Sequence, residues 1–311
     1  MEIFKRPLTA AQIKTKAREL GADLVGIADG ARIDTSRITA LDGGRVIVLA
    51  RRLNDGVARI RRWDDRHKYY NDELALTHLE ETSLELVYWL EDAGYPALIV
   101  PPTHVDPSSY ENPEQHLTPM LSLPHAAVEA GLGTLGLNLQ LLTPEFGPRV
   151  ILTAVLCSVP VECDSPMTNA LCLGPSCGRC LKTCPPDAVR EWDRDWKACD
   201  THRSPHGFAQ LSAHLDRIIE ADDAKTRKEL LRSETSFNLW QSILRGSGVI
   251  TGCRRCADVC PIGKDYEQML ADAHEEIPEN TPQKEQRLAA MQGRSPAYEK
   301  QKRFIGFLKR V

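Results

Sequence analysis

Two short cysteine motifs with identical spacing constrain this chain more than any other feature of its sequence. Residues 177–185 read CGRCLKTCP and residues 253–261 read CRRCADVCP, so both follow the pattern CxxCxxxCP. All ten cysteines lie after residue 156, which divides the 311 residues into a cysteine-free half and a cysteine-rich half. The chain starts without an apolar leader and has no apolar run that could span a bilayer. We therefore expect a cytoplasmic protein without membrane contact, whose thiols are not paired as disulfides.

The spacing of these motifs is the one by which bacterial ferredoxins hold iron–sulfur clusters. The CxxC pair places two thiolates on neighbouring irons, and the third cysteine, followed by a proline that turns the chain, reaches the partner cluster. Two [4Fe–4S] clusters need eight thiolates, and the two motifs supply six. The other two are predicted to be Cys172, which a turn at Gly174-Pro175 lets reach in, and the lone Cys199. The predicted ligands are Cys172, Cys177, Cys180 and Cys260 for the first cluster, and Cys184, Cys199, Cys253 and Cys256 for the second.

Two alternatives to this assignment stay open. Zinc is also held by four cysteines in structural sites, although it has no need of the CxxxCP ending. The ferredoxin pattern would place its first cysteine at Gly174, so the first cluster could instead have three cysteines and be an open or [3Fe–4S] centre. The remaining cysteines, Cys157 and Cys163, flank an apolar stretch and are expected to be ordinary buried thiols.

Hydrophobic periodicity predicts a mixed helix-and-sheet domain before the cysteine-rich region. The pattern indicates helices over residues 9–20 and 71–93 and strands over 23–28, 45–50, 97–100 and 149–156. Residues 101–124 are rich in proline and histidine and predict a long functional loop. We expect a domain over 1–160, a cluster module over 161–270 with a helical insertion at 200–250, and a polar, solvated extension over 271–311.

Charge and a glycine motif argue against two classes of ligand. The chain has 39 basic and 43 acidic side chains, a formal net charge of −4, which is not the strong basic excess typical of nucleic-acid-binding proteins. Residues 131–136 read GLGTLG and match GxGxxG. A dinucleotide-binding fingerprint should follow a strand, whereas residues 125–130 favour a short helix, so we do not expect nicotinamide binding here.

The stretch HAAVEAGLGTLGLNLQLLTPEFGPRVILTAVL, followed by the two cysteine motifs with Cys199 between them, resembles the corrinoid-dependent reductase superfamily. Its members include epoxyqueuosine reductases and reductive dehalogenases. The resemblance implies an α+β fold: a nitroreductase-like α/β core that holds cobalamin, followed by a ferredoxin-like module with two [4Fe–4S] clusters. It also implies crosswise ligation of the clusters. The residues that would line the corrinoid are Gly131, Gly133, Gly136, Asn138 and Thr143, and Arg149 would meet its periphery or form a structural ion pair.

The resemblance implies a reductase in which two clusters pass electrons to cobalamin, and a nearby side chain donates a proton. Candidate proton donors are Tyr110 and His116, because Leu117 stands about where epoxyqueuosine reductases carry an acidic aspartate. We therefore expect reduction of a small organic substrate, as in dehalogenases, with electrons from a low-potential donor of the ferredoxin or flavodoxin type. Epoxyqueuosine reduction is the alternative, with tRNA expected to be an unlikely partner. An electron-transfer protein without cobalamin is a third possibility.

Overall fold

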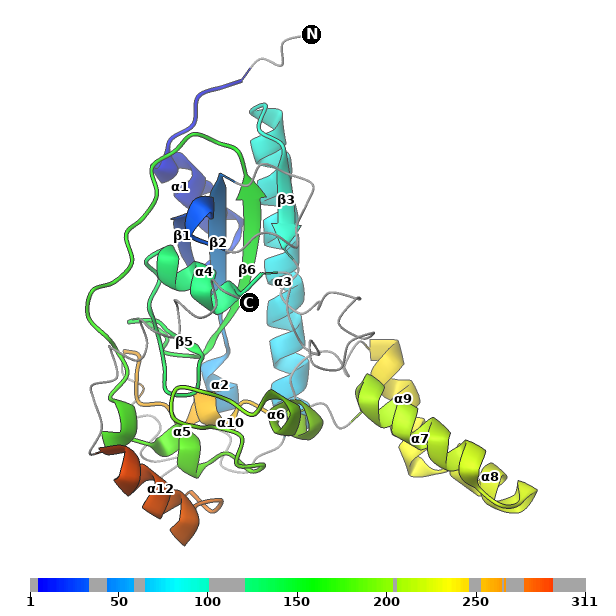
Figure 1. The fold of residues 1–311 in the computed structure, drawn as a ribbon. Coiled ribbons are helices and arrows are strands. Elements are labelled where there is room, and N and C mark those ends of the chain that lie inside the picture. The colour runs from blue at the N-terminus through cyan, green and yellow to red at the C-terminus, as the bar shows by residue number, and fades with distance from the viewer. Residues whose placement is uncertain are drawn as a thin grey trace.

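A four-stranded antiparallel sheet forms the centre of the molecule (Figure 1). The computed structural model describes residues 5–33, 44–58, 65–100, 121–203, 206–245, 253–264, 266 and 277–292. The strand order is β1-β2-β6-β3, so the last strand in the chain lies between two earlier ones. The strands are β1 (Leu24–Asp29), β2 (Arg45–Arg52), β3 (Ala97–Val100) and β6 (Val150–Cys157).

Side chains alternate along the strands and feed two separate cores. On β2, Ile47 and Leu49 face a core built with helices α1 (Ala10–Leu20) and α3 (Asp65–Asp92). Val46 and Val48 face the opposite core, which is covered by α4 (Leu123–Glu129). The sheet is therefore buried on both faces. That burial explains why its strands read as continuous apolar runs rather than as alternating ones.

Short elements surround the sheet and build the cysteine-rich part of the chain. The glycine motif follows helix α4 rather than a strand, and its second half begins the hairpin of β4 (Thr134–Leu135) and β5 (Leu141–Leu142). Two short elements, η1 (Gly30–Arg32) and α2 (Asp55–Ala58), lie at the ends of β1 and β2. The cysteine-rich part contains η4 (Gly174–Ser176), α5 (Arg179–Lys182), α6 (Trp196–Arg203), α10 (Arg255–Asp258) and α12 (Pro282–Gln292).

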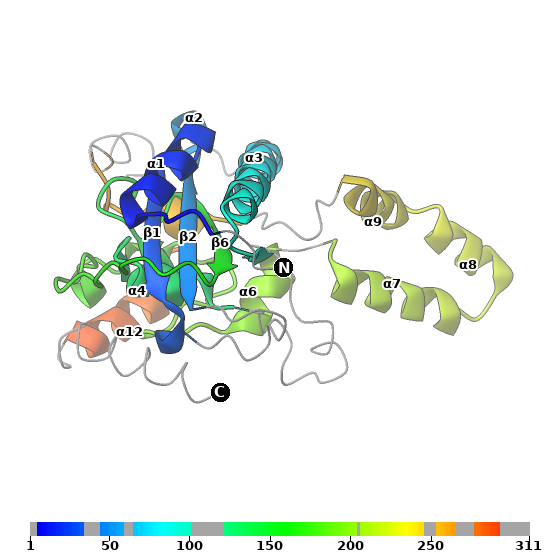
Figure 2. The ribbon, with the colours of Figure 1, turned by 90° about the horizontal axis from the view of Figure 1, so that it is seen from above.

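The predicted helical insertion is a separate projection. Helices α7 (Phe208–Glu220), α8 (Ala224–Leu231) and α9 (Glu234–Arg245) extend away from the rest of the molecule (Figures 1 and 2). Helix α7 leads outward, α8 lies at the tip and α9 returns (Figure 2). We call residues 206–245 the helical arm.

The predicted mixture of helix and sheet is confirmed, and all four predicted strands lie within two residues of the observed ones. The long helix α3 begins at Asp65, six residues before its predicted start. The extension after residue 271 was expected to be solvated, yet α12 buries Leu288 and Met291 against the cysteine-rich part. No helix of the described part of the chain is long and apolar enough to cross a bilayer.

Gly26→Ala should destabilise the fold, because a Cβ at Gly26 would stand 2.3 Å from the carbonyl oxygen of Ala130. Overpacking of this kind costs about 1–3 kcal/mol, which urea denaturation would detect as a lower midpoint. Gly56→Ala is the matched control, since nothing lies within 4 Å of its Cβ. It should unfold at the same urea concentration as the unmodified chain or slightly above it. Equal midpoints for the two variants would contradict this account of the α4–β1 contact.

Candidate functional site

Two cavities lie where the two cysteine motifs meet, and four thiols line each of them. Each cavity takes cysteines from both motifs, so the motifs are interleaved rather than side by side. Cys172, Cys177, Cys180 and Cys260 line the first cavity, and Cys184, Cys199, Cys253 and Cys256 line the second. The structure thus brings together the two groups of four that the sequence predicts.

Two glycines with a left-handed backbone conformation shape the chain around the first cavity. Gly174 has φ +67° and opens the η4 turn, which carries the chain from Cys172 to Cys177. Gly178 has φ +56°, and a Cβ there would stand 2.4 Å from the side chain of Leu288. Other residues avoid this backbone region and would also collide with α12. The predicted turn at Gly174 is therefore present, and it lets Cys172 line the cavity despite its unusual spacing.

Arg149 holds the second motif against the sheet. Its buried guanidinium donates Nη1 hydrogen bonds to the carbonyl oxygens of Ala257 (2.9 Å) and Cys260 (2.8 Å), and Nη2 donates to Ile262. The same guanidinium stacks on the ring of Tyr266, with 3.6 Å between Cζ and the ring centroid. Because the guanidinium donors point at three carbonyls of one loop, Arg149 fixes the position of the chain around Cys260.

A buried ion network anchors α10 to the first turns of α3. Lys68 and Arg254 both pair with Asp258, and Arg254 also pairs with Asp72. All four side chains are buried. Burial raises the pKa of Asp72 to about 6, although the Arg254 guanidinium opposes the shift. Removing any one partner would leave an uncompensated buried charge, so this network fixes the CxxC pair that contains Arg254.

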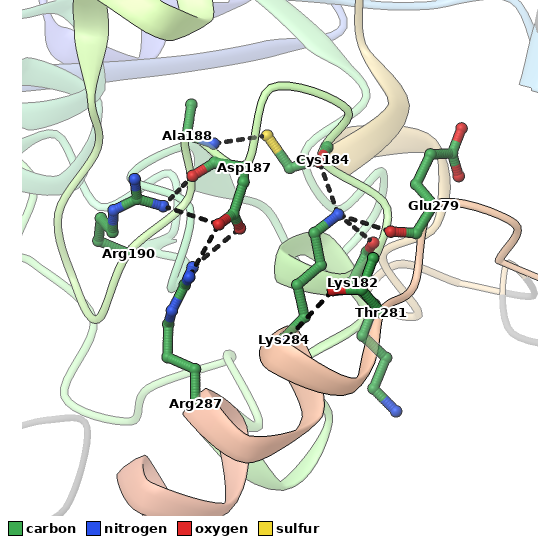
Figure 3. A network of polar contacts seen from close by, with 9 residues as sticks. All are labelled: Lys182, Cys184, Asp187, Ala188, Arg190, Glu279, Thr281, Lys284 and Arg287. Atoms are coloured by element: carbon green, nitrogen blue, oxygen red, sulfur yellow. Dashed lines mark hydrogen bonds and ion pairs between the residues drawn. The ribbon is translucent and has the colours of Figure 1, made fainter.

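Helix α12 holds the first cysteine motif through two basic side chains (Figure 3). The buried ammonium of Lys284 donates to the carbonyl oxygens of Lys182 (2.9 Å), Cys184 (2.8 Å) and Glu279 (2.7 Å). Arg287 forms a bidentate pair with Asp187, with both Nη–Oδ distances at 2.8 Å. Lys284 therefore satisfies carbonyl groups at the carboxyl end of α5 and places a positive charge beside the second cavity.

The thiols of the cavities are poor ligands unless a cation accompanies them. Burial raises the pKa of Cys172, Cys180 and Cys256, and it raises the pKa of Cys260 to about 12. Neighbouring thiols raise the pKa of Cys180 further. Four thiolates in such a space need positive charge among them, which the iron ions of a cluster would provide. The donor set therefore fits an iron–sulfur cluster in each cavity.

Backbone amides already point at two of these sulfurs. The amides of Leu137 and Gly174 donate to Cys172 Sγ, both at 3.3 Å, and the amide of Ala188 donates to Cys184 Sγ at 3.1 Å. Such bonds stabilise thiolate ligands and tune cluster potentials. Within the described ranges, no group of three or more Cys, His, Asp or Glu side chains is close enough to hold a single metal ion. The thiols line the two cavities in groups of four, the number of cysteines that a [4Fe–4S] cluster takes.

The residues predicted to line a corrinoid are mostly engaged with the protein itself. A Cβ on Gly131 would meet Ser165 O at 2.6 Å, and one on Gly133 would meet Leu142 O at 1.9 Å. Gly136 and Asn138 line the first cysteine cavity. Thr143 is buried and bonds within its own turn, and Arg149 makes the contacts described above. Among the described residues, this set forms no open cradle for a corrinoid. That these residues line a corrinoid therefore stays a prediction.

Several predicted residues lie elsewhere. Tyr110 and His116, the predicted proton donors, lie outside the described residues. Cys157 is buried in the core on β6, and Cys163 is half-buried; neither lines a cysteine cavity.

Sequence reasoning missed the cationic residues around the cavities, above all Arg194 and Lys284. The one available signal was Arg254 and Asp258, two charged residues inside a motif that had to be buried.

Arg194 is the most informative of the missed residues. It lines the second cavity, where its Nη2 donates to the carbonyl oxygen of Asn138 and its Cζ lies 4.9 Å from the ring centroid of Trp196. Its Nε is buried and has no protein partner. Although burial raises the pKa of Cys256, the Arg194 charge opposes that rise. A buried donor without a partner, close to a cysteine of the cavity, is suited to an acceptor inside that cavity.

Comparison with known proteins supports the resemblance. No protein-family model matches the chain. It is 37% identical to the tetrachloroethene reductive dehalogenase of Sulfurospirillum multivorans over 79 residues, which cover 24% of this chain and 15% of that relative. It is 29% identical to the epoxyqueuosine reductase of Gloeobacter violaceus over 223 residues, which cover 59% of this chain and 61% of the relative. The chain thus spans less than two thirds of either relative.

A solved structure extends the comparison to the fold. The epoxyqueuosine reductase of Bacillus subtilis superposes with a TM-score of 0.50 and 16% identity, covering 88% of this chain and 69% of that one. The resemblance to epoxyqueuosine reductases and reductive dehalogenases is thereby confirmed, and both groups are reductases. The epoxyqueuosine reductases are the more numerous relatives and match more of the chain.

The prediction that tRNA is an unlikely partner is wrong. Most of the relatives found by sequence are epoxyqueuosine reductases, which belong to the tRNA-modifying branch of the superfamily. The error lies in the use of net charge. A total of −4 averages over the whole surface, whereas a phosphate backbone responds to the local field of the one face that it contacts.

Asp187→Asn should loosen α12. Burial alone would raise the pKa of Asp187, but the hydrogen bonds and charge of Arg287 lower it overall. A carboxylate whose folded pKa is lowered stabilises the fold above its normal pKa, and the stabilisation is lost as the pH falls through the folded value. The pair is partly exposed and is worth up to about 1 kcal/mol. At pH 7 we expect faster amide hydrogen exchange across α12 in the variant, and convergence with the unmodified chain in acid.

Asp216→Asn, on the exposed surface of α7, is the control for this experiment and should leave α12 exchange unchanged. Identical α12 exchange in Asp187→Asn and the unmodified chain at pH 7 would show that the ion pair does not hold the helix.

Proposed function

We propose that this chain is a two-cluster iron–sulfur reductase of the epoxyqueuosine reductase kind. The observation that carries the proposal is the pair of four-thiol cavities, each built crosswise from the two cysteine motifs. The numerous epoxyqueuosine reductase relatives favour an epoxide in a modified tRNA nucleoside as the substrate. The external electron donor is proposed to be a ferredoxin or a flavodoxin.

In this proposal the eight cysteines hold two [4Fe–4S] clusters, which supply one-electron transfer when bound. The residues of the chain have two tasks. Arg149, Lys284 and the network around Arg254 fix the loops that carry the thiols. The amides of Leu137, Gly174 and Ala188 hydrogen-bond to sulfur and so favour the thiolate.

Cobalamin is proposed as the electron acceptor on the basis of the resemblance alone. The described residues predicted for it are engaged with the protein, so we derive no step through a corrinoid. Tyr110 and His116 remain the proposed proton donors.

Reductive dehalogenation of a small organic molecule is the second candidate function. Two observations favour it: the 37% identity with the tetrachloroethene reductive dehalogenase, and Leu117 near the place where the resemblance implies an acidic aspartate.

Anaerobic purification tests the proposal in two steps. The first is iron analysis, for which we expect about eight irons per chain, with the loss of one cluster in Cys253→Ser. Cys163→Ser is the matched control and should keep all the iron, because Cys163 lies outside both cavities. Zinc in place of iron would contradict the proposal.

The second step incubates the reduced protein and added cobalamin with an epoxyqueuosine-containing tRNA stem loop, and separately with halogenated phenols. Conversion of the nucleoside supports the main proposal, and release of halide alone supports the second candidate. Full iron without bound cobalt or turnover would instead indicate an electron-transfer protein.

Arg194→Gln should lower the midpoint potential of one cluster. The reduced cluster carries one more negative charge, so the nearby guanidinium favours it. We expect about a tenfold change in the reduction equilibrium, or about 59 mV for one electron, in an anaerobic redox titration followed by electron paramagnetic resonance. Arg194→Lys should retain most of the potential. Arg232→Gln, exposed on the helical arm, removes the same charge at a distance and should change neither midpoint. If both midpoints also stay unchanged in Arg194→Gln, the tuning role is excluded.

A further inference from the structure

The helical arm exposes far more apolar surface than it buries. Of its described side chains, only His214, Leu239 and Ser242 are buried, and two of these are polar. The His214 imidazole and the Ser236 hydroxyl share a hydrogen bond of 2.8 Å, so part of the contact inside the arm is polar. Six large apolar side chains of the arm are exposed: Leu215, Ile219, Leu231, Phe237, Trp240 and Ile243.

These side chains follow the helical repeat on the two longer helices. Leu215 and Ile219 are four residues apart on α7, and Phe237 and Trp240 are three apart on α9, with their ring centroids separated by 6.1 Å. Ile219 and Ile243 are 72% and 67% exposed. Soluble chains rarely leave apolar side chains gathered on one element unless a partner covers them.

Charge narrows the choice of partner. Helices α7 and α9, which carry five of the six exposed apolar side chains, have one arginine each, so their surface offers little positive charge to a nucleic acid or to a strongly acidic carrier protein. A helix that lies on a membrane has a polar face rich in lysine and arginine, and neither α7 nor α9 has one. A neutral apolar surface is instead suited to contact with an identical surface.

Area supports the same conclusion. The five exposed apolar side chains that lie on α7 and α9 present roughly 500 Å² of apolar surface. A stable interface buries about 800 Å² on each partner, polar rim included. The exposed side chains are therefore sufficient for the centre of one standard interface. Because the arm projects from the rest of the molecule, a second arm can approach it (Figures 1 and 2).

We propose that the helical arm is a dimerisation element, in which α7 and α9 pack against α7 and α9 of a second copy of this chain. The assembly is a four-helix bundle with two-fold symmetry, the arrangement by which two-helix units commonly bury their apolar faces. Helices of 13 and 12 residues give a bundle about 20 Å long. The dimer is independent of the cysteine cavities and of the proposed reductase activity.

Sedimentation velocity of the full chain, over a micromolar concentration range, tests the dimer. The unmodified protein should sediment with twice the mass of one chain. The double variant Ile219→Glu/Ile243→Glu should weaken association at least tenfold, because both side chains are exposed in one chain and buried in the dimer. Leu74→Glu is the matched control: Leu74 is a 52% exposed leucine on α3, outside the arm, and its variant should remain dimeric. Circular dichroism and iron content should be the same for all three proteins.

Two results would overturn the proposal. One is an unmodified protein that stays monomeric throughout the concentration range. The other is a dimer that the double variant leaves intact. If the protein is monomeric and the double variant instead loses binding to the tRNA stem loop, the arm contacts RNA and the dimer is excluded.

Discussion

Crosswise sharing of eight cysteine thiols between two cavities is the constraint on which the rest of the cysteine-rich part depends. Each cavity needs cysteines from both motifs, so neither motif can complete a cavity alone. Long connections must therefore close before any cavity exists, and the entropy of closing them has to be offset by contacts elsewhere. Burial also raises the pKa of Cys180 and Cys260, so for these two thiols the protein alone does not favour the ligand form.

Buried cations offset both the entropy of closing these connections and the unfavourable ionisation of the thiols. Arg149 and Lys284 each bond to three carbonyl oxygens, and in both cases one of these belongs to a cysteine of a cavity. Arg149 comes from the start of a sheet strand, and Lys284 from a helix near the end of the described chain. The sheet and the last helix thus hold the cysteine loops from opposite directions. Their positive charge also favours negative charge in the cavities between them.

Local patterns made much of the fold predictable. The strands read as short apolar runs, and Thr9 caps the first helix through a capping box with Gln12, a purely local signal. Contacts with distant parts of the chain explain two features that the local patterns did not indicate. Helix α12 is polar in sequence, and Leu288 is buried because it packs with Leu181 and Ala188 and lies directly over Gly178. The glycines of the GxGxxG motif suggested that a ligand comes close to the backbone. At Gly133 the group that lies close is instead the carbonyl oxygen of Leu142.

The sequence by itself predicted which eight cysteines line the two cavities, because cysteine spacing and the count of thiols are properties of the chain. It also determined the mixture of helix and sheet and the presence of the helical arm. Only the tertiary structure decided which cations surround the cavities, because Arg149, Arg194 and Lys284 meet their partners across long stretches of chain. It also decided that the arm leaves its apolar face exposed. Periodicity shows that a helix has an apolar face, but only the packing shows what covers that face.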